Sequence, residues 1–147
     1  MTLEDKTIER SLVRPPKANA RDFRETTPIV AVVDDDKTFC SILSLFLNHI
    51  GYGSVSVFND GKEIVEAIRA AMIIPDLVLM DYRMPTMNGI AAAGKIQKMC
   101  PKARIIMISS DYSVAPIASL LGLKFLMKPF SRNELYEVIQ ESQLLAQ

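Results

Sequence analysis

The stretch IVAVVDDD at residues 29–36 decides the fold of this chain. Its first five residues are apolar and mostly β-branched, which is typical of a strand buried on both faces of a parallel sheet. Three acidic residues follow at once, and apolar residues then recur with helical spacing from Phe39 to Ile50, where Gly51 supplies a stop. A buried strand that leads through acidic residues into a helix indicates the first unit of an α/β fold.

The same alternation of strand and helix recurs four more times along the chain. Further strands are predicted at 53–58, 76–80, 104–108 and 123–127. The helical patterns that follow them cover 64–72, 89–99, 114–121 and a last segment that begins near Ser131. Asp60 and the Ser131–Glu134 pair have the residue types and spacing of helix caps. We therefore expect an α/β fold with a doubly wound, five-stranded parallel sheet and helices on both faces.

Length and composition restrict the function classes. The chain has 147 residues, with 17 Lys plus Arg against 17 Asp plus Glu, so its net charge gives no overall attraction to nucleic acid or to a membrane surface. Its apolar runs fall far short of the ~20 residues that a membrane span needs, and no signal peptide pattern opens the chain. We expect a cytoplasmic protein, with Cys40 and Cys100 as reduced thiols.

The composition changes at Pro28. Residues 1–27 are rich in charge and poor in large apolar side chains, which predicts a flexible leader before a folded domain at 28–147. The alternative interpretation of the leader is an arm that docks on a partner.

Chemically useful side chains follow the predicted strands at their carboxyl ends, where ligands of such sheets collect. These are Asp34, Asp35 and Asp36 after the first strand, Asp81 after the third, Ser109 and Ser110 after the fourth, and Lys128 after the fifth. For Asp36 we favour the role of cap for the following helix.

Three of these carboxylates converge if the first and third strands are neighbours. Asp34, Asp35 and Asp81 would then repel one another unless a cation joined them, and oxygen ligands without His or Cys point to Mg²⁺. Lys128 and the Ser109 hydroxyl would face the same pocket, as a phosphoryl group requires.

These residues resemble the receiver domain of bacterial-type two-component response regulators. The matching segments are VVDDD at 32–36, PDLVLMDYRMPTMNG at 75–89, IIMISS at 105–110 and KPF at 128–130. The resemblance extends from about Ile29 to Ser142 and is to a stand-alone, chemotaxis-regulator-like receiver. It implies the flavodoxin-like strand order 2-1-3-4-5.

The resemblance also implies a role for each acidic residue. Asp81 would accept a phosphoryl group from a phosphohistidine on a sensor histidine kinase or a histidine phosphotransfer protein. Asp35, Asp81 and the backbone carbonyl of Arg83 would bind Mg²⁺, with Asp34 acting through an intervening water. The protein would then be a phosphoacceptor in signalling, not an enzyme beyond catalysing its own phosphorylation and dephosphorylation.

The resemblance further implies a switch. Lys128, which precedes a cis proline in this family, would pair with a phosphoryl oxygen. Ser109 would turn inward to hydrogen-bond the phosphoryl group, and Phe125 would follow by changing rotamer. The face formed by the helix at 114–121, the fifth strand and the last helix would then change shape and bind a downstream target protein.

Two features depart from the family pattern. Ser109 and Lys128 are only 19 positions apart, so we expect the helix at 114–121 to be short or reshaped, which puts the usual partner geometry in doubt. Arg83 and Asp111 flank the predicted pocket, and an ion pair between them would restrict attacking water. We therefore hypothesise slow hydrolysis of the acyl phosphate.

Other classes remain as alternatives. Few residues follow the last predicted helix, so we expect a stand-alone receiver without a DNA-binding domain, although an excised part of a longer regulator remains open. VVDDDKT also fits the opening of haloacid-dehalogenase-type phosphatases, with Asp34 as nucleophile, but that interpretation leaves Asp81 unexplained. A third alternative is a receiver fold that serves only as an interaction module and takes no phosphoryl group.

Overall fold

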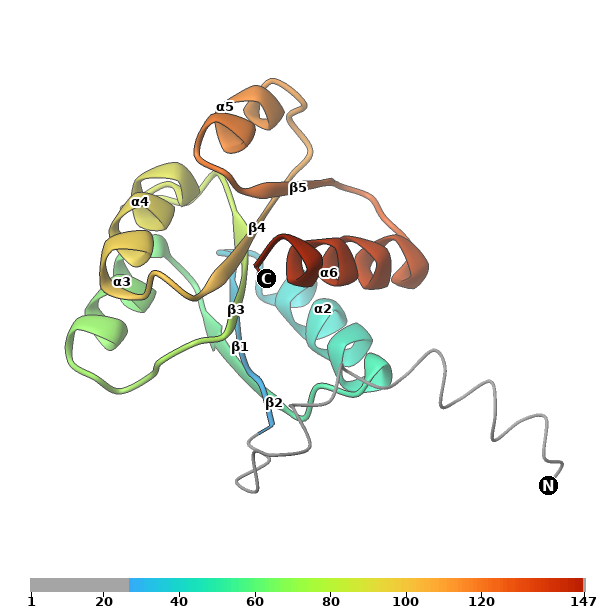
Figure 1. Ribbon diagram of the computed structural model, residues 1–147, viewed down its shortest axis with the longest axis horizontal. Helices are drawn as coiled ribbons and strands as arrows, with labels where there is room; N and C mark the ends of the chain where they lie inside the picture. Colours follow the sequence, from blue (N-terminus) through green and yellow to red (C-terminus); the bar gives the residue numbers. More distant parts are fainter. Residues whose placement is uncertain (1–26, 147) are drawn as a thin grey trace, which may run out of the picture.

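Five parallel strands form one sheet in the order β2-β1-β3-β4-β5, so the predicted doubly wound sheet and strand order are confirmed (Figure 1). The computed structural model describes residues 27–146, and the predicted leader therefore lies outside the described residues except for Thr27. The strands are β1 (Ile29–Val33), β2 (Ser54–Phe58), β3 (Leu77–Asp81), β4 (Arg104–Ser109) and β5 (Lys124–Met127).

Helices cover both faces of the sheet, as Figure 1 shows. On one face lie α2 (Lys37–Ile50) and α6 (Arg132–Ala146). On the other lie α3 (Gly61–Arg69), α4 (Gly89–Met99) and α5 (Val114–Leu120). Among residues 27–146, no helix is long and apolar enough to cross a membrane.

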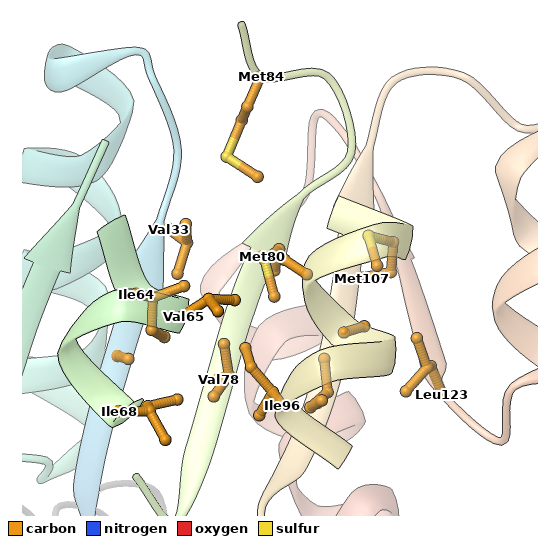
Figure 2. Close-up of a cluster of buried hydrophobic side chains, with 14 of the residues drawn as sticks. Val33, Ile64, Val65, Ile68, Val78, Met80, Met84, Ile96, Met107 and Leu123 are labelled. Carbon is orange, nitrogen blue, oxygen red and sulfur yellow. The ribbon is translucent and has the colours of Figure 1, made fainter. Parts of the chain in front are cut away.

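Each face has its own apolar core, because successive residues of β1 point to opposite sides. Val33 joins the cluster under α3 and α4, which also contains Ile64 and Ile96 (Figure 2). Val32 joins the cluster under α2 and α6, which also contains Leu43. Burying each such side chain stabilises the fold by about 1.5–3 kcal/mol. The continuous apolar run of β1 is thus explained by its burial on both faces.

The predicted caps are present. Asp36 Oδ1 accepts a hydrogen bond from the Phe39 N–H at 3.1 Å and begins α2. Asp60 caps α3 through the Lys62 N–H at 2.8 Å. Ser131 and Glu134 form the reciprocal pair of a capping box at the start of α6.

One helix ends earlier than its apolar pattern predicts. We expected Met72 on the buried face of α3, but α3 ends at Arg69 and the Met72 side chain is 80% exposed. Ala71 takes a left-handed conformation with φ of 57°, and the Met72 N–H donates to the Ala67 carbonyl at 2.9 Å. This Schellman-type turn directs the chain away from the sheet before the next turn of helix can form.

The expected short helix between β4 and β5 is confirmed. α5 has seven residues, fewer than any other helix in the described part of the chain, and contains Pro116. Gly122, with φ of 74°, then turns the chain into β5. Both cysteines are free, and Cys40 is buried as a small apolar side chain.

Candidate phosphoryl-acceptor site

The acidic residues that follow β1 and β3 meet at one edge of the sheet. Val33 pairs with Met80 across β1 and β3, so the residues that come next, Asp34 and Asp81, are neighbours. Carboxylate oxygens of Asp34, Asp35 and Asp81 lie within 4.8 Å of one another. Asp34 is buried, Asp81 is half-buried and Asp35 is exposed, so the cluster opens toward solvent on the side of Asp35.

Asp34 is held firmly in this cluster. Its N–H donates to the Phe58 carbonyl at 3.0 Å, and its own carbonyl accepts from the Asn59 side chain at 3.1 Å and from Cys40 Sγ at 3.2 Å. Its Oδ1 accepts from the Asp36 N–H at 2.9 Å. These contacts fix the direction of the Asp34 carboxylate.

Lys128 reaches the cluster from the end of β5. Its Nζ lies 2.8 Å from Asp34 Oδ2 and 3.3 Å from Asp81 Oδ1. The Lys128–Pro129 peptide bond is cis, as the family resemblance implied. The Lys128 N–H donates to the Ser109 carbonyl at 2.9 Å, which ties the lysine to the end of β4. The ammonium therefore bridges two carboxylates at the base of the site.

The electrostatics of the cluster favour an additional cation. Burial, followed by the charge of Asp34, raises the pKa of Asp81 from 3.8 to about 6, although Lys128 opposes this rise. Burial by itself would lower the pKa of Lys128, but its hydrogen bonds and the charges of Asp34 and Asp81 raise it. One ammonium thus faces the three carboxyl side chains of Asp34, Asp35 and Asp81. The uncompensated negative charge and the hard oxygen donors suit a divalent cation such as Mg²⁺.

Asp60 holds the loop that follows Asp81, a second role that the sequence did not reveal. Asp60 was expected only to cap α3, yet its carboxylate also accepts from the Thr86 N–H at 2.8 Å and the Met87 N–H at 3.1 Å. Burial tends to raise the pKa of Asp60, but the backbone N–H donors, led by that of Lys62, lower it overall. No local pattern signals this contact, because 26 positions separate Asp60 from Thr86.

Gly89 ends this loop in close contact with the backbone of Asp81. Its N–H donates to the Tyr82 carbonyl at 2.8 Å, and a Cβ at this position would lie 2.3 Å from the Asp81 carbonyl oxygen. Glycine therefore allows α4 to begin directly against the backbone of Asp81.

The mouth of the site is flanked by the ion pair that the sequence suggested. Arg83 and Asp111 approach to 3.0 Å, with 74% and 32% of their side chains exposed. The Ser113 hydroxyl and N–H, followed by Arg83, hold the pKa of Asp111 below its ordinary value. Beside this pair, Asp35, Tyr82, Arg83, Met84, Pro85 and Asn88 line a shallow cavity of about 400 Å³.

The two predicted switch residues lie beside the site on β4 and β5. Ser109 is buried, and its Oγ accepts from the Asp111 N–H at 3.0 Å. Phe125 is half-buried and packs edge-on against Tyr112, with ring centroids 6.1 Å apart. In this arrangement the Ser109 oxygen is engaged with the backbone of its own loop.

The family model of the response regulator receiver domain matches residues 30–140. The chain belongs to this family. The receiver is 33% identical over 115 residues to the chemotaxis protein CheY of Thermotoga maritima, a match that covers 76% of the chain and 94% of CheY. Three other curated relatives, the sensor kinase/phosphatase LuxN of Vibrio campbellii, the transcription factor SKN7 of Chaetomium thermophilum and the transcriptional regulatory protein ZraR of Escherichia coli, are longer. The receiver spans between 13% and 26% of their length.

Solved structures show the same fold. The CheX–CheY–BeF3–Mg²⁺ complex of Borrelia burgdorferi contains a chain that matches with a TM-score of 0.75 at 22% identity, over 90% of the receiver and 96% of that chain. The receiver domain of the sensor histidine kinase PA1611 from Pseudomonas aeruginosa matches with a TM-score of 0.69 at 25% identity, over 79% and 97% of the two chains. The structure of that domain has a magnesium ion coordinated in its active site cleft.

Proposed function

We propose that this receiver takes a phosphoryl group on Asp81 from a phosphohistidine of a sensor histidine kinase or a histidine phosphotransfer protein. The observation that carries the proposal is the position of Asp81 at the end of β3, half-buried, beside Asp34 and within 3.3 Å of the Lys128 ammonium. A carboxylate is a weak nucleophile toward an anionic phosphoryl donor, so cationic groups and exact positioning must lower the barrier.

The transfer forms one bond and breaks one. A carboxylate oxygen of Asp81 attacks phosphorus, the bond between phosphorus and the donor imidazole nitrogen breaks, and the electron pair stays on that nitrogen. The product is an acyl phosphate on Asp81. Lys128, which already lies between Asp34 and Asp81, pairs with a phosphoryl oxygen and offsets its negative charge.

The same cluster fits Mg²⁺. Asp35, Asp81 and the backbone carbonyl of Arg83 are the proposed ligands, with Asp34 as a neighbouring charge, and the crowded carboxylate oxygens are hard donors within 4.8 Å of one another. The magnesium ion in the similar PA1611 receiver domain supports this assignment. When bound, Mg²⁺ supplies positive charge to the transferring oxygens.

Signalling follows from the residues that border the phosphoryl group. Ser109 Oγ exchanges its hydrogen bond from the Asp111 N–H for one that the hydroxyl donates to the phosphoryl group, and Phe125 rotates into the space beside it. The face of α5, β5 and α6 then changes shape. Tyr112, Leu120 and Met127 already expose apolar area there, and we propose that a downstream target protein binds this face.

The phosphatase alternative is disfavoured by the geometry of Asp34. This carboxylate is 2% exposed and is engaged by Lys128 and by the Asp36 N–H, so a substrate phosphorus has no open approach to it. Asp81, with 12% of its side chain exposed against 3% for Asp34, is the more accessible of the two carboxylates.

The test is the intact mass after incubation with Mg²⁺ and acetyl phosphate. We expect one phosphoryl addition, stable in acid and labile in base, on the natural chain and none on Asp81→Asn. Asp36→Asn is the matched control, because Asp36 lies on the same rim and Asn caps a helix equally well. No addition to the natural chain would overturn the proposal and favour the interaction module, whereas an addition that maps to Asp34 would favour the phosphatase.

A further inference from the structure

An aromatic ring faces the lysine of the acidic cluster. The Nζ of Lys128 lies 4.0 Å from the centroid of the Phe39 ring, well within the range of a cation–π interaction. Phe39 belongs to the first turn of α2, and the Asp36 cap accepts a hydrogen bond from its N–H at 3.1 Å. The cap that begins α2 therefore also fixes the position of the Phe39 ring.

A second ring supports the first. Phe130, two residues after Lys128, meets Phe39 edge-to-face, with centroids 5.9 Å apart and planes at 88°. Both rings are half-buried and pack against the apolar cluster under α2 and α6. Phe39 is thus held between the helix cap and Phe130, with its face toward the ammonium.

The Phe39 ring attracts the Lys128 ammonium before and after phosphoryl transfer, whereas the Asp81 carboxylate does so only before it. Lys128 now shares its charge between Asp34 and Asp81, but on phosphoryl transfer Asp81 becomes an uncharged acyl group whose phosphate bears the charge. The ammonium must then leave Asp81 Oδ1 for a phosphoryl oxygen. The quadrupole of the Phe39 ring does not change during this exchange, so its attraction for the ammonium persists before and after transfer.

We propose that Phe39 is a positioning residue for phosphoryl transfer, its ring face holding the Lys128 ammonium beside Asp81. This inference rests on the proposed function. A purely structural role would require only apolar volume, which leucine also provides, whereas positioning of the ammonium requires the aromatic face.

The chain offers a matched control on the same helix. Phe46 lies two turns after Phe39, is also half-buried and packs against the same apolar cluster. The only ammonium ring contact found within residues 27–146 is that of Phe39 with Lys128. A loss of packing should therefore affect Phe46→Leu and Phe39→Leu alike, whereas a loss of positioning should affect only Phe39→Leu.

The experiment measures the rate constant of phosphorylation by acetyl phosphate with Mg²⁺, for variants whose folding is verified by urea denaturation. We expect Phe39→Leu and Phe39→Met to be slower by about three- to tenfold, as the loss of a partly desolvated cation–π contact implies. Phe39→Tyr, which keeps the ring face, and Phe46→Leu should stay within about twofold of the natural chain.

A double-mutant cycle isolates the lysine. In a Lys128→Met background, Phe39→Leu should cause no further slowing, because no ammonium remains for the ring to hold. Equal slowing in both backgrounds, failure of Phe39→Tyr to restore the rate, or an equal effect of Phe46→Leu would overturn the inference. Asp81→Asn in the same series separates the two proposals, because it shows whether the phosphoryl group is on Asp81. If the natural chain is modified at Asp81 while Phe39→Leu reacts at full rate, only the role of Phe39 is refuted. If the natural chain is not modified, both proposals are refuted.

Discussion

Replacing Asp81 with asparagine removes one charge from the crowded cluster, so we expect Asp81→Asn to be more stable than the natural chain when no divalent cation is present. The pKa of Asp81 rises from 3.8 to about 6, through burial first and then through the charge of Asp34. At about 1.4 kcal/mol for each tenfold change in the ionisation constant, this rise corresponds to about 3 kcal/mol. Solvent reaches part of the site and screens these charges, so we expect about half of that figure, a gain of about 1.5 kcal/mol near neutral pH.

The sign of this effect depends on pH. Because the folded chain raises the pKa of Asp81, the protonated carboxyl favours folding below pH 3.8, and this contribution is lost as the pH rises through about 6. The stability difference between Asp81→Asn and the natural chain should therefore be largest near neutral pH and shrink toward pH 4. Lys128 keeps Asp34 as its partner at 2.8 Å in the variant, so no ammonium is left unpaired.

The assay is urea denaturation of the natural chain, Asp81→Asn and the rim control Asp36→Asn, each with chelator at neutral pH and near pH 4. Asp36→Asn should match the natural chain at neutral pH. Added Mg²⁺ should stabilise the natural chain more than Asp81→Asn, because the variant lacks one proposed ligand. If Asp81→Asn is no more stable at neutral pH, or if its gain persists in acid, the account of charge crowding is wrong.

Three further variants test other parts of the structure. Ala71→Gly should raise the free energy of unfolding by about 0.5–1 kcal/mol in urea denaturation, because Ala71 occupies a left-handed conformation that glycine adopts without a steric cost. The Arg83→Ala, Asp111→Ala double variant should release phosphate from its acyl phosphate faster than the natural chain, because the ion pair at the mouth is gone; an unchanged rate of phosphate release would contradict this. Asp60→Asn should lower the free energy of unfolding by about 1–3 kcal/mol at neutral pH, since the amide can replace only part of the acceptor capacity for three N–H groups. Because the folded chain lowers the pKa of Asp60, the stabilisation by its carboxylate is present above pH 3.8 and is lost as the pH falls below that value. The difference in the free energy of unfolding between Asp60→Asn and the natural chain should therefore become smaller in acid.

The fold could be predicted because its strands are buried on both faces. Runs such as IVAVV and RIIMI are continuous and apolar, and each of the five predicted strands overlaps a strand of the sheet. Because the carboxyl ends of parallel strands meet at one edge of the sheet, the sequence alone predicts that the residues after the strands lie close together. The structure indeed places Asp34, Asp35, Asp81 and Lys128 at one site.

A left-handed turn and the contacts between distant segments could not be predicted. Periodicity extended α3 to Met72 because it does not report the left-handed turn at Ala71. The reach of Asp60 to the loop after Asp81 has no local signature. Phe39 fits the apolar spacing of α2, and only the folded chain shows that Lys128, 89 positions later, lies over its ring.

The edge-on contact of Tyr112 with Phe125 has a practical consequence for spectroscopy. The chain has four tyrosines and no tryptophan, so tyrosine dominates its near-ultraviolet emission. Tyr82 directly follows Asp81, and Tyr112 touches the ring that is proposed to rotate, so both report on the site from their own surroundings. Intrinsic fluorescence should therefore follow the proposed cation binding and phosphorylation without any dye, and Tyr82→Phe and Tyr112→Phe should assign each signal to its source.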